Sequence, residues 1–205
     1  YRRQIEQDGE LFDELTSTII RQVGDLRKMV DEFSSFARLP KPVFRQEDAV
    51  DLVRQAMFLQ EVAKPHIQFH FATAGEVVPQ IACDRHQFGQ AMTNVLKNAT
   101  EAVEARAKDA EPDYRARIVV TVSADAQRLS VSIADNGIGL PENSERIVEP
   151  YVTTREKGTG LGLAIVNKIV EEHGGEMLFA ANDGGGTVVT LVFARDPGAE
   201  SEAAE

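Results

Sequence analysis

The chain has 205 residues, of which 42% are hydrophobic and 27% are charged, and these values exclude a disordered or collagen-like protein. Its 33 acidic and 22 basic residues give a net charge of −11, which argues against duplex nucleic acid or an anionic membrane as a main partner. The single cysteine, Cys83, excludes a disulfide framework and any multi-cysteine metal site, and it suits a reducing compartment.

No apolar run approaches the roughly 18 residues needed to cross a membrane, and the charged start, Tyr1-Arg2-Arg3-Gln4, is unlike a signal peptide. We therefore expect a cytoplasmic chain without direct membrane contact. Because it starts without methionine inside a polar helical pattern, we also expect it to belong to a longer protein.

Apolar residues spaced three and four apart predict a long helix over residues 9–38. This seam consists of Phe12, Leu15, Ile19, Val23, Leu26, Val30, Phe33 and Ala37. Its spacing is close to a heptad repeat, as in a helix packed along a bundle, so we expect a partner helix to cover it. Folding of the helix back onto its own domain is the alternative. The prolines of Leu39-Pro40-Lys41-Pro42 end the helix and mark a domain boundary.

After this boundary, the pattern predicts one layer of helices on a mostly antiparallel sheet, which is an α+β fold. The expected helices cover residues 48–62, 85–106 and 161–173. The expected strands cover residues 67–73, 78–83, 117–124, 128–135, 176–181 and 187–194. Asp84 with Gln87 resembles a capping box at the start of the second of these helices. We expect the acidic tail, residues 196–205, to be disordered.

Two asparagines lie four residues apart in Asn94-Val95-Leu96-Lys97-Asn98-Ala99. This spacing puts Asn94 and Asn98 on one helical face, about 6 Å apart along the axis. Their carboxamide oxygens suit a magnesium ion that also binds phosphate oxygens. By themselves, two asparagines fit an ordinary exposed polar face at least as well.

Three glycine-containing segments follow. Asp135-Asn136-Gly137-Ile138-Gly139-Leu140 ends a strand with a carboxylate that can accept a hydrogen bond from an exocyclic amine, although an ordinary turn has the same residues. Gly158-Thr159-Gly160-Leu161-Gly162-Leu163 opens a helix whose N-terminal N–H groups can bind phosphate. It is neither a P-loop nor a dinucleotide fingerprint, because Gly-Lys-Ser/Thr is absent and Ile165 replaces the third glycine. Gly184-Gly185-Gly186-Thr187 makes a tight turn into the last strand.

The order of these motifs from Asn94 to Thr187 resembles the N, G1, F, G2 and G3 boxes of the sensor histidine kinase catalytic domain. Glu149-Pro150-Tyr151-Val152-Thr153-Thr154 takes the place of the F box, with tyrosine where phenylalanine is commoner. The similarity covers about residues 44–195. The preceding helix is similar to the second dimerisation helix of kinases of the nitrogen-regulation (NtrY) type.

The resemblance implies a two-layer α/β sandwich, the Bergerat ATP-binding fold shared with Hsp90, type II topoisomerases and MutL, preceded by one long helix. It divides the chain into part of a dimerisation domain (1–42), a catalytic domain (43–195) and an acidic tail (196–205). The implied ligands are ATP and Mg²⁺. The implied partners are an upstream phosphoacceptor helix, a response-regulator receiver domain and a second copy in a homodimer. The full-length parent would be an inner-membrane sensor.

The resemblance also implies roles for individual residues. Asp135 would bind the adenine amine, with Gly137, Ile138, Gly139 and Thr187 near the base. Asn98 would ligate magnesium, with Asn94 beside it. The phosphates would be lined by Gly158, Thr159, Gly160, Leu161 and Gly162. A lid over residues 141–157 would carry Tyr151, Thr153 and Thr154, and its Arg155 and Lys157 would contact the γ-phosphate. The catalytic residues would be Asn94, Arg155 and Lys157.

Position 94 separates two mechanisms, because hydrolysing relatives place a glutamate there and the amide of Asn94 cannot act as a general base. We therefore expect transfer of the γ-phosphate to a histidine and then to a response-regulator aspartate. Two alternatives are an ATP-driven conformational ATPase of the Hsp90 or MutL class and a nucleotide-binding module without catalytic duty. The chain's own histidines lie outside any acceptor motif, and we expect them to be structural or exposed: His66, His70, His86 and His173. His173 is also well placed to complement a helix dipole.

Overall fold

The computed structural model describes residues 2–75, 80–140, 147–152 and 158–197, with side chains described from residue 11 onward except at positions 28, 32 and 35. Five strands form one sheet in the order β2-β4-β5-β7-β6, and only the β2–β4 pair is parallel. The strands are β2 (Gln68–Ala74), β4 (Arg117–Ala124), β5 (Arg128–Asp135), β6 (Glu176–Ala181) and β7 (Thr187–Ala194). The predicted strands of this sheet are confirmed to within a residue or two.

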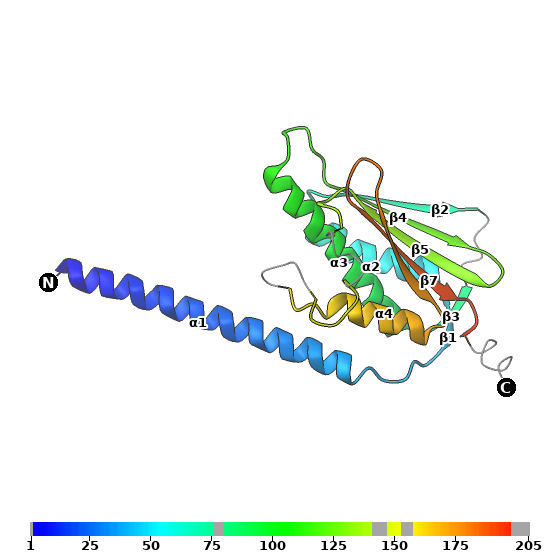
Figure 1. The fold of residues 1–205 in the computed structure, drawn as a ribbon, viewed down its shortest axis with the longest axis horizontal. Coiled ribbons are helices and arrows are strands. Elements are labelled where there is room, and N and C mark those ends of the chain that lie inside the picture. Colours follow the sequence, from blue (N-terminus) through cyan, green and yellow to red (C-terminus); the bar gives the residue numbers. More distant parts are fainter. Residues whose placement is uncertain (1, 76–79, 141–146, 153–157, 198–205) are drawn as a thin grey trace.

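Three helices cover one face of this sheet and form the second layer (Figure 1). They are α2 (Ala49–Ala63), α3 (Arg85–Asp109) and α4 (Gly162–Glu172). Alternate residues of the central strands point into the core between the layers, and they are Ile118, Val120, Val122, Leu129, Val131 and Ile133. This alternation is the period-two pattern from which the strands were predicted. The architecture is therefore the expected α+β sandwich.

A small second sheet was only half predicted. Strand β3 (Gln80–Cys83) was expected, but its antiparallel partner β1 (Arg45–Asp48) was not. The sequence of β1 is Arg-Gln-Glu-Asp, which has neither apolar alternation nor strand propensity. The strand exists because pairing with β3 satisfies its backbone groups, and no local pattern reports that pairing.

The predicted capping box at α3 is only half formed. Asp84 caps the helix, because its Oδ1 accepts hydrogen bonds from the backbone N–H groups of His86 (2.9 Å) and Gln87 (3.1 Å). The Gln87 side chain makes no hydrogen bond back to the backbone of Asp84, as a complete capping box would require. Its Nε2 instead donates to the carbonyl oxygen of Pro40 at 2.8 Å.

His173, at the end of α4, is structural as expected, but not through the helix dipole. Its side chain is fully buried, its Nδ1 donates to the carbonyl oxygen of Ile169 (2.7 Å), and its Nε2 accepts from the backbone N–H of Asp84 (3.1 Å). Burial lowers the pKa of His173 below its ordinary value of 6.5. The imidazole is therefore held neutral, and the expected role of a cation at the helix end is wrong.

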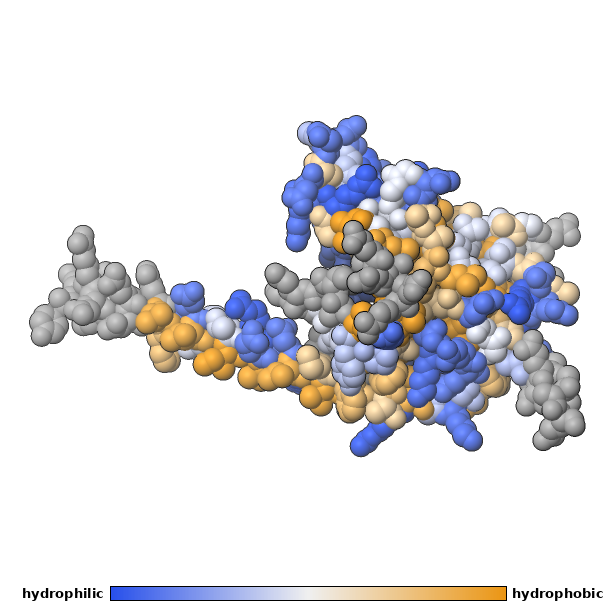
Figure 2. All heavy atoms as spheres, viewed as in Figure 1, coloured by the Kyte–Doolittle hydropathy of each residue, from blue (hydrophilic) through white to orange (hydrophobic). Residues whose placement is uncertain are grey.

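The N-terminal helix α1 (Arg2–Ala37) projects away from the two layers (Figure 1). Its seam is exposed, from 48% at Phe33 to 69% at Phe12, and Figure 2 shows apolar residues along the helix. Near its end, Phe36 packs on the core of the two layers, and Lys168 Nζ lies 5.6 Å from the centre of its ring. Folding of the seam back onto the domain is therefore not observed.

Within the described part of the chain, no helix combines the length and the apolarity required to cross a bilayer.

We predict that α1 drives self-association. Burying one Phe, Leu, Ile or Val side chain stabilises by about 1.5–3 kcal/mol, and seven such side chains are exposed along the seam. Light scattering should show a species larger than a monomer, and Leu26→Glu should shift it toward the monomer. A wild-type protein that is already monomeric, with a size unchanged by Leu26→Glu, would contradict this packing argument.

Candidate nucleotide-binding site

A cavity of about 380 Å³ lies between α3, the start of α4 and the end of the sheet where β5 finishes. Ten residues predicted from the motifs line it: Asn94, Asn98, Asp135, Ile138, Gly139, Gly158, Thr159, Gly160, Gly162 and Thr187. These residues come from segments almost a hundred positions apart in the sequence. The fold therefore gathers most of the predicted site around one space.

Asp135 is buried at the end of β5, with 4% of its surface exposed. Its Oδ1 accepts hydrogen bonds from the backbone N–H groups of Gly137 (2.8 Å) and Thr187 (3.3 Å). The Nδ2 of Asn182 donates to the carbonyl oxygen of Asp135 at 2.7 Å. The carboxylate is thus fixed by the turn that follows it and by the start of β7.

The loop after Asp135 packs directly on α3. A Cβ atom on Gly137 would lie 2.5 Å from the backbone carbonyl carbon of Ala102, so no larger residue fits without separating the two segments. The backbone N–H of Ile138 also donates to the carbonyl oxygen of Ala102 at 3.3 Å. Gly137 therefore lies beside the cavity as a spacer, and its two neighbours in the motif, Ile138 and Gly139, line it.

Asn136 braces the same loop from outside the cavity. Its Oδ1 accepts from the backbone N–H of Arg117 (2.8 Å) and the hydroxyl of Tyr114 (3.1 Å), and its Nδ2 donates to the carbonyl oxygen of Arg115 (2.8 Å). Arg106 Nη1 donates to the carbonyl oxygen of Asn136 at 2.9 Å. Sequence reasoning missed these supporting residues, because they come from separate elements with no common spacing.

The α3 helix carries Asn94 and Asn98 on its cavity side, together with Lys97 and Glu101. Lys97 and Glu101 were not among the predicted site residues. Both stand three residues after a selected asparagine, so helical spacing could have identified them. The rest of the wall is apolar and includes Val95, Ala99, Ile133, Leu163, Phe179 and Val189. Such a wall suits a flat aromatic ring.

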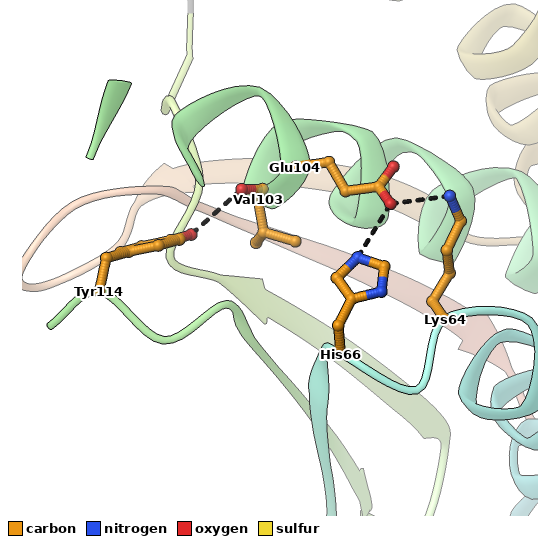
Figure 3. Close-up of polar contacts among 5 residues, drawn as sticks. All are labelled: Lys64, His66, Val103, Glu104 and Tyr114. Atoms are coloured by element: carbon orange, nitrogen blue, oxygen red, sulfur yellow. Dashed lines mark hydrogen bonds and ion pairs between the residues drawn. The ribbon is translucent and has the colours of Figure 1, made fainter. Parts of the chain in front are cut away.

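Contacts near its C-terminal end hold α3 in place (Figure 3). The Glu104 carboxylate accepts from Lys64 Nζ at 2.7 Å and lies 3.1 Å from His66 Nε2, and both partners precede β2. The hydrogen bond from Lys64 is the main reason that the pKa of Glu104 is lowered. The hydroxyl oxygen of Tyr114 lies 3.4 Å from the carbonyl oxygen of Val103. These contacts fix the helix that positions the two asparagines.

The glycine-rich segment before α4 forms the remaining wall. Gly160 has a positive φ of 70°, and its carbonyl oxygen accepts from the backbone N–H of Tyr151 at 3.1 Å. No side chain among the described residues caps α4, and its first residues, Gly162 and Leu163, line the cavity. The N-terminal N–H groups of this helix are therefore directed to where an anion would bind.

The remaining predicted residues do not line the cavity or lie outside the described part of the chain. Neither Leu161, which is fully buried in the core, nor Tyr151, which is 60% exposed, lines the cavity. Thr153, Thr154, Arg155 and Lys157 lie outside the described residues, as do positions 141–146 of the expected lid and 198–205 of the tail.

The residues present fit a magnesium ion shared with a ligand. Asn94, Asn98 and Glu101 offer hard oxygen donors on one helical face of the cavity. Among the described residues, no group of three His, Cys, Asp or Glu side chains could hold a metal.

Comparison with known proteins decides the family. Residues 83–197 match the family profile of histidine kinase-, DNA gyrase B- and HSP90-like ATPases. The chain belongs to this ATPase family. It is 50% identical over 207 residues to nitrogen regulation protein NtrY of Azorhizobium caulinodans, covering 98% of this chain and 26% of NtrY. It is 31% identical over 194 residues to sporulation kinase E of Bacillus subtilis, covering 92% of this chain and 24% of that kinase. The chain thus spans about a quarter of the length of these relatives.

Solved structures of this ATPase family share the fold. The catalytic domain of histidine kinase ThkA has a TM-score of 0.64 and 29% identity, covering 76% of this chain and 97% of that domain. ThkA in complex with the response regulator protein TrrA has a TM-score of 0.70 and 26% identity, covering 87% of this chain and 50% of that chain. Full-length ShkA in complex with AMPPNP has a TM-score of 0.71 and 28% identity, covering 87% of this chain and 38% of ShkA.

We predict that Gly137→Ala lowers the free energy of unfolding by about 1–3 kcal/mol, because the added methyl group must push the loop away from α3. The matched control is Gly162→Ala, where a Cβ atom meets nothing within 4 Å. That variant should keep its stability. Chemical denaturation measures both changes, and equal stability of the two variants would contradict the close approach at Gly137.

Proposed function

We propose that the chain is the ATP-binding catalytic part of an NtrY-type sensor histidine kinase, with residues 1–42 from its dimerisation domain. The observation that carries this proposal is the cavity that combines a fixed carboxylate, Asp135, with the neutral pair Asn94 and Asn98. The relatives named as kinases support it at the level of the whole protein. In this proposal the chain lies in the cytoplasm, and its parent is a membrane-bound sensor.

Asp135 binds the adenine ring in this proposal. A buried carboxylate accepts a charge-assisted hydrogen bond from the exocyclic amine of adenine, and such bonds are stronger than neutral ones. The backbone N–H groups of Gly137 and Thr187 hold the carboxylate before the base arrives. The apolar wall, which includes Ile133 and Val189, then shields the ring from water.

The phosphates bind at the opposite end of the cavity. Gly158, Gly160 and Gly162 lead into α4, whose N-terminus favours negative charge. Asn98, with Asn94 beside it, holds a magnesium ion that neutralises charge on the phosphate oxygens. Arg155 and Lys157 are proposed as further contacts to the γ-phosphate.

Asn94 favours transfer to a protein over hydrolysis. A carboxamide cannot remove a proton from water, so this chain lacks a general base at the position where hydrolysing relatives carry glutamate. The γ-phosphate therefore passes to a histidine on an upstream helix of the dimeric parent, and from there to an aspartate of a response regulator. Binding and orientation of the substrate supply most of the rate enhancement.

We predict that Asp135→Asn weakens ATP binding by about 1.5–3 kcal/mol, which corresponds to roughly tenfold to a hundredfold in affinity. Asn98→Ala should weaken binding only when magnesium is present. Calorimetry with magnesium and with a chelator measures both effects. The matched control is Asp125→Asn, whose Oδ1 accepts backbone bonds from Gln127 (2.8 Å) and Arg128 (2.7 Å) in the β4–β5 turn.

Unchanged affinity in Asp135→Asn would remove the adenine assignment. Equal loss in Asn98→Ala with and without magnesium would remove the ligand assignment. Similar losses in Asp135→Asn and Asp125→Asn would indicate a general effect of the lost charge.

We predict that this chain does not phosphorylate itself, because none of its four histidines lies in an acceptor motif. With γ-labelled ATP, acid-labile label should appear only when the chain acts on the upstream helix that carries the acceptor. Release of inorganic phosphate without labelled protein would instead favour an ATPase of the Hsp90 or MutL class. Label on the chain alone would contradict the prediction.

A further inference from the structure

The segment between α1 and β1, residues 38–44, here called the linker, is attached to the start of α3 at two points. The carbonyl oxygen of Pro40 accepts from Gln87 Nε2 at 2.8 Å, and the backbone N–H of Val43 donates to Asp84 Oδ2 at 2.9 Å. The side chain of Leu39 packs against the hydrophobic core that lies between the helix layer and the sheet. The linker therefore follows the surface of the domain (Figure 1).

Asp84 serves the helix and the linker with different oxygen atoms. Its Oδ1 caps α3 through His86 and Gln87, and its Oδ2 accepts from Val43. Burial acts to raise the pKa of Asp84, but these three backbone N–H groups outweigh it and lower that pKa. The group is therefore an ionised carboxylate at neutral pH, with both oxygens engaged.

His173 joins the end of α4 to the same point. Its Nε2 accepts from the backbone N–H of Asp84, and its Nδ1 is tied to Ile169 within α4. The ring of Phe44, in the linker, meets the His173 ring edge to face at 5.2 Å and 81°. The fully buried imidazole thus contacts α3, α4 and the linker together.

The two helices that meet here also frame the nucleotide cavity at a distance from this contact. Asn94 and Asn98 stand ten and fourteen residues after Asp84, and Gly162 stands eleven residues before His173. Ten residues of helix span about 15 Å. The linker is therefore held at the N-terminus of α3 and the C-terminus of α4, the two helices that also line the cavity.

We propose that Asp84 and His173 form a clasp that fixes the linker and thereby sets the direction of α1 relative to the nucleotide cavity. His173 is a positioning residue, because it acts through Asp84 and Phe44 rather than on the nucleotide. The contacts of Asp84 and His173 do not depend on the proposed function, but the effect of the direction of α1 on phosphate transfer rests on it. In a kinase of this kind, the direction of α1 decides where the acceptor histidine can reach the γ-phosphate.

Two variants distinguish the effect of the clasp on the linker from the effects of helix capping and of ring packing. Asp84→Asn keeps a good N-cap residue, but the amide has one acceptor oxygen and cannot serve both α3 and Val43. His173→Phe keeps an aromatic ring beside Phe44 and removes the nitrogen that accepts from Asp84. The matched control is Asp48→Asn, because Asp48 caps α2 by accepting from the backbone N–H of Asp51 at 3.0 Å.

The readout is the distance between spin labels on Asp25→Cys in α1 and Ala126→Cys in the β4–β5 turn, both exposed positions. Samples are diluted into excess unlabelled protein, so that only distances within one chain count. Cys83 is fully buried, and burial raises the pKa of its thiol to about 12, which protects it from the label. ATP affinity of each variant is measured in parallel.

We expect one narrow distance distribution in the wild type and in Asp48→Asn. Asp84→Asn and His173→Phe should broaden it at least about twofold while ATP affinity stays within about threefold, because the domain remains folded and only the linker opens. An unchanged distribution in His173→Phe would overturn the clasp, as would equal broadening in Asp48→Asn. A wild-type protein that does not bind ATP would refute the proposed function. The distance distributions would then still show whether the clasp fixes the linker.

Discussion

The close approach of Gly137 to Ala102 is the contact on which the cavity depends. It brings the loop after β5 against α3, so that Asp135 and Asn98 face one space. The hydrogen bond from Ile138 to the carbonyl oxygen of Ala102 holds this contact along the backbone. Any side chain at position 137 would push the loop after β5 away from α3 and so separate the carboxylate of Asp135 from the two asparagines.

The α3 helix, against which this loop packs, is itself held in place along its length. Its middle carries the two asparagines, its later turns are tied to Lys64, His66 and Tyr114, and its N-terminus is capped by Asp84. The α4 helix runs from the glycine-rich segment to His173, which contacts Asp84. The two helices therefore form a rigid pair that has the nucleotide cavity at one place and the linker at another. In this arrangement a few polar contacts and the packing of Phe36, Leu39 and Phe44 connect the long projecting helix to the domain.

The exposed seam of α1 is a continuous row of large apolar side chains. Single exposed apolar residues are normal on globular proteins, but a row of seven along one helix is typical of an interface. The similarity to NtrY, of which this chain spans about a quarter, fits a helix that completes its packing in a larger assembly. The core of the two layers, in contrast, lies between the sheet and three helices.

The sequence by itself determined all the helices and strands except β1, and it determined the candidate ligands. Strong periodicity located α1, α3, β4 and β5. The order of five short motifs predicted a nucleotide site from the sequence alone. Only the tertiary structure decided how these parts meet. Three contacts depend on a partner distant in the chain. The polar strand β1 pairs with β3, Asn136 accepts from the backbone N–H of Arg117, and Gln87 donates to the carbonyl oxygen of Pro40. The neutral state of His173 was likewise decided by burial, which no helix-end pattern reports. Local spacing records what a residue can do within its own element, whereas partners from other elements fix its contacts and its charge.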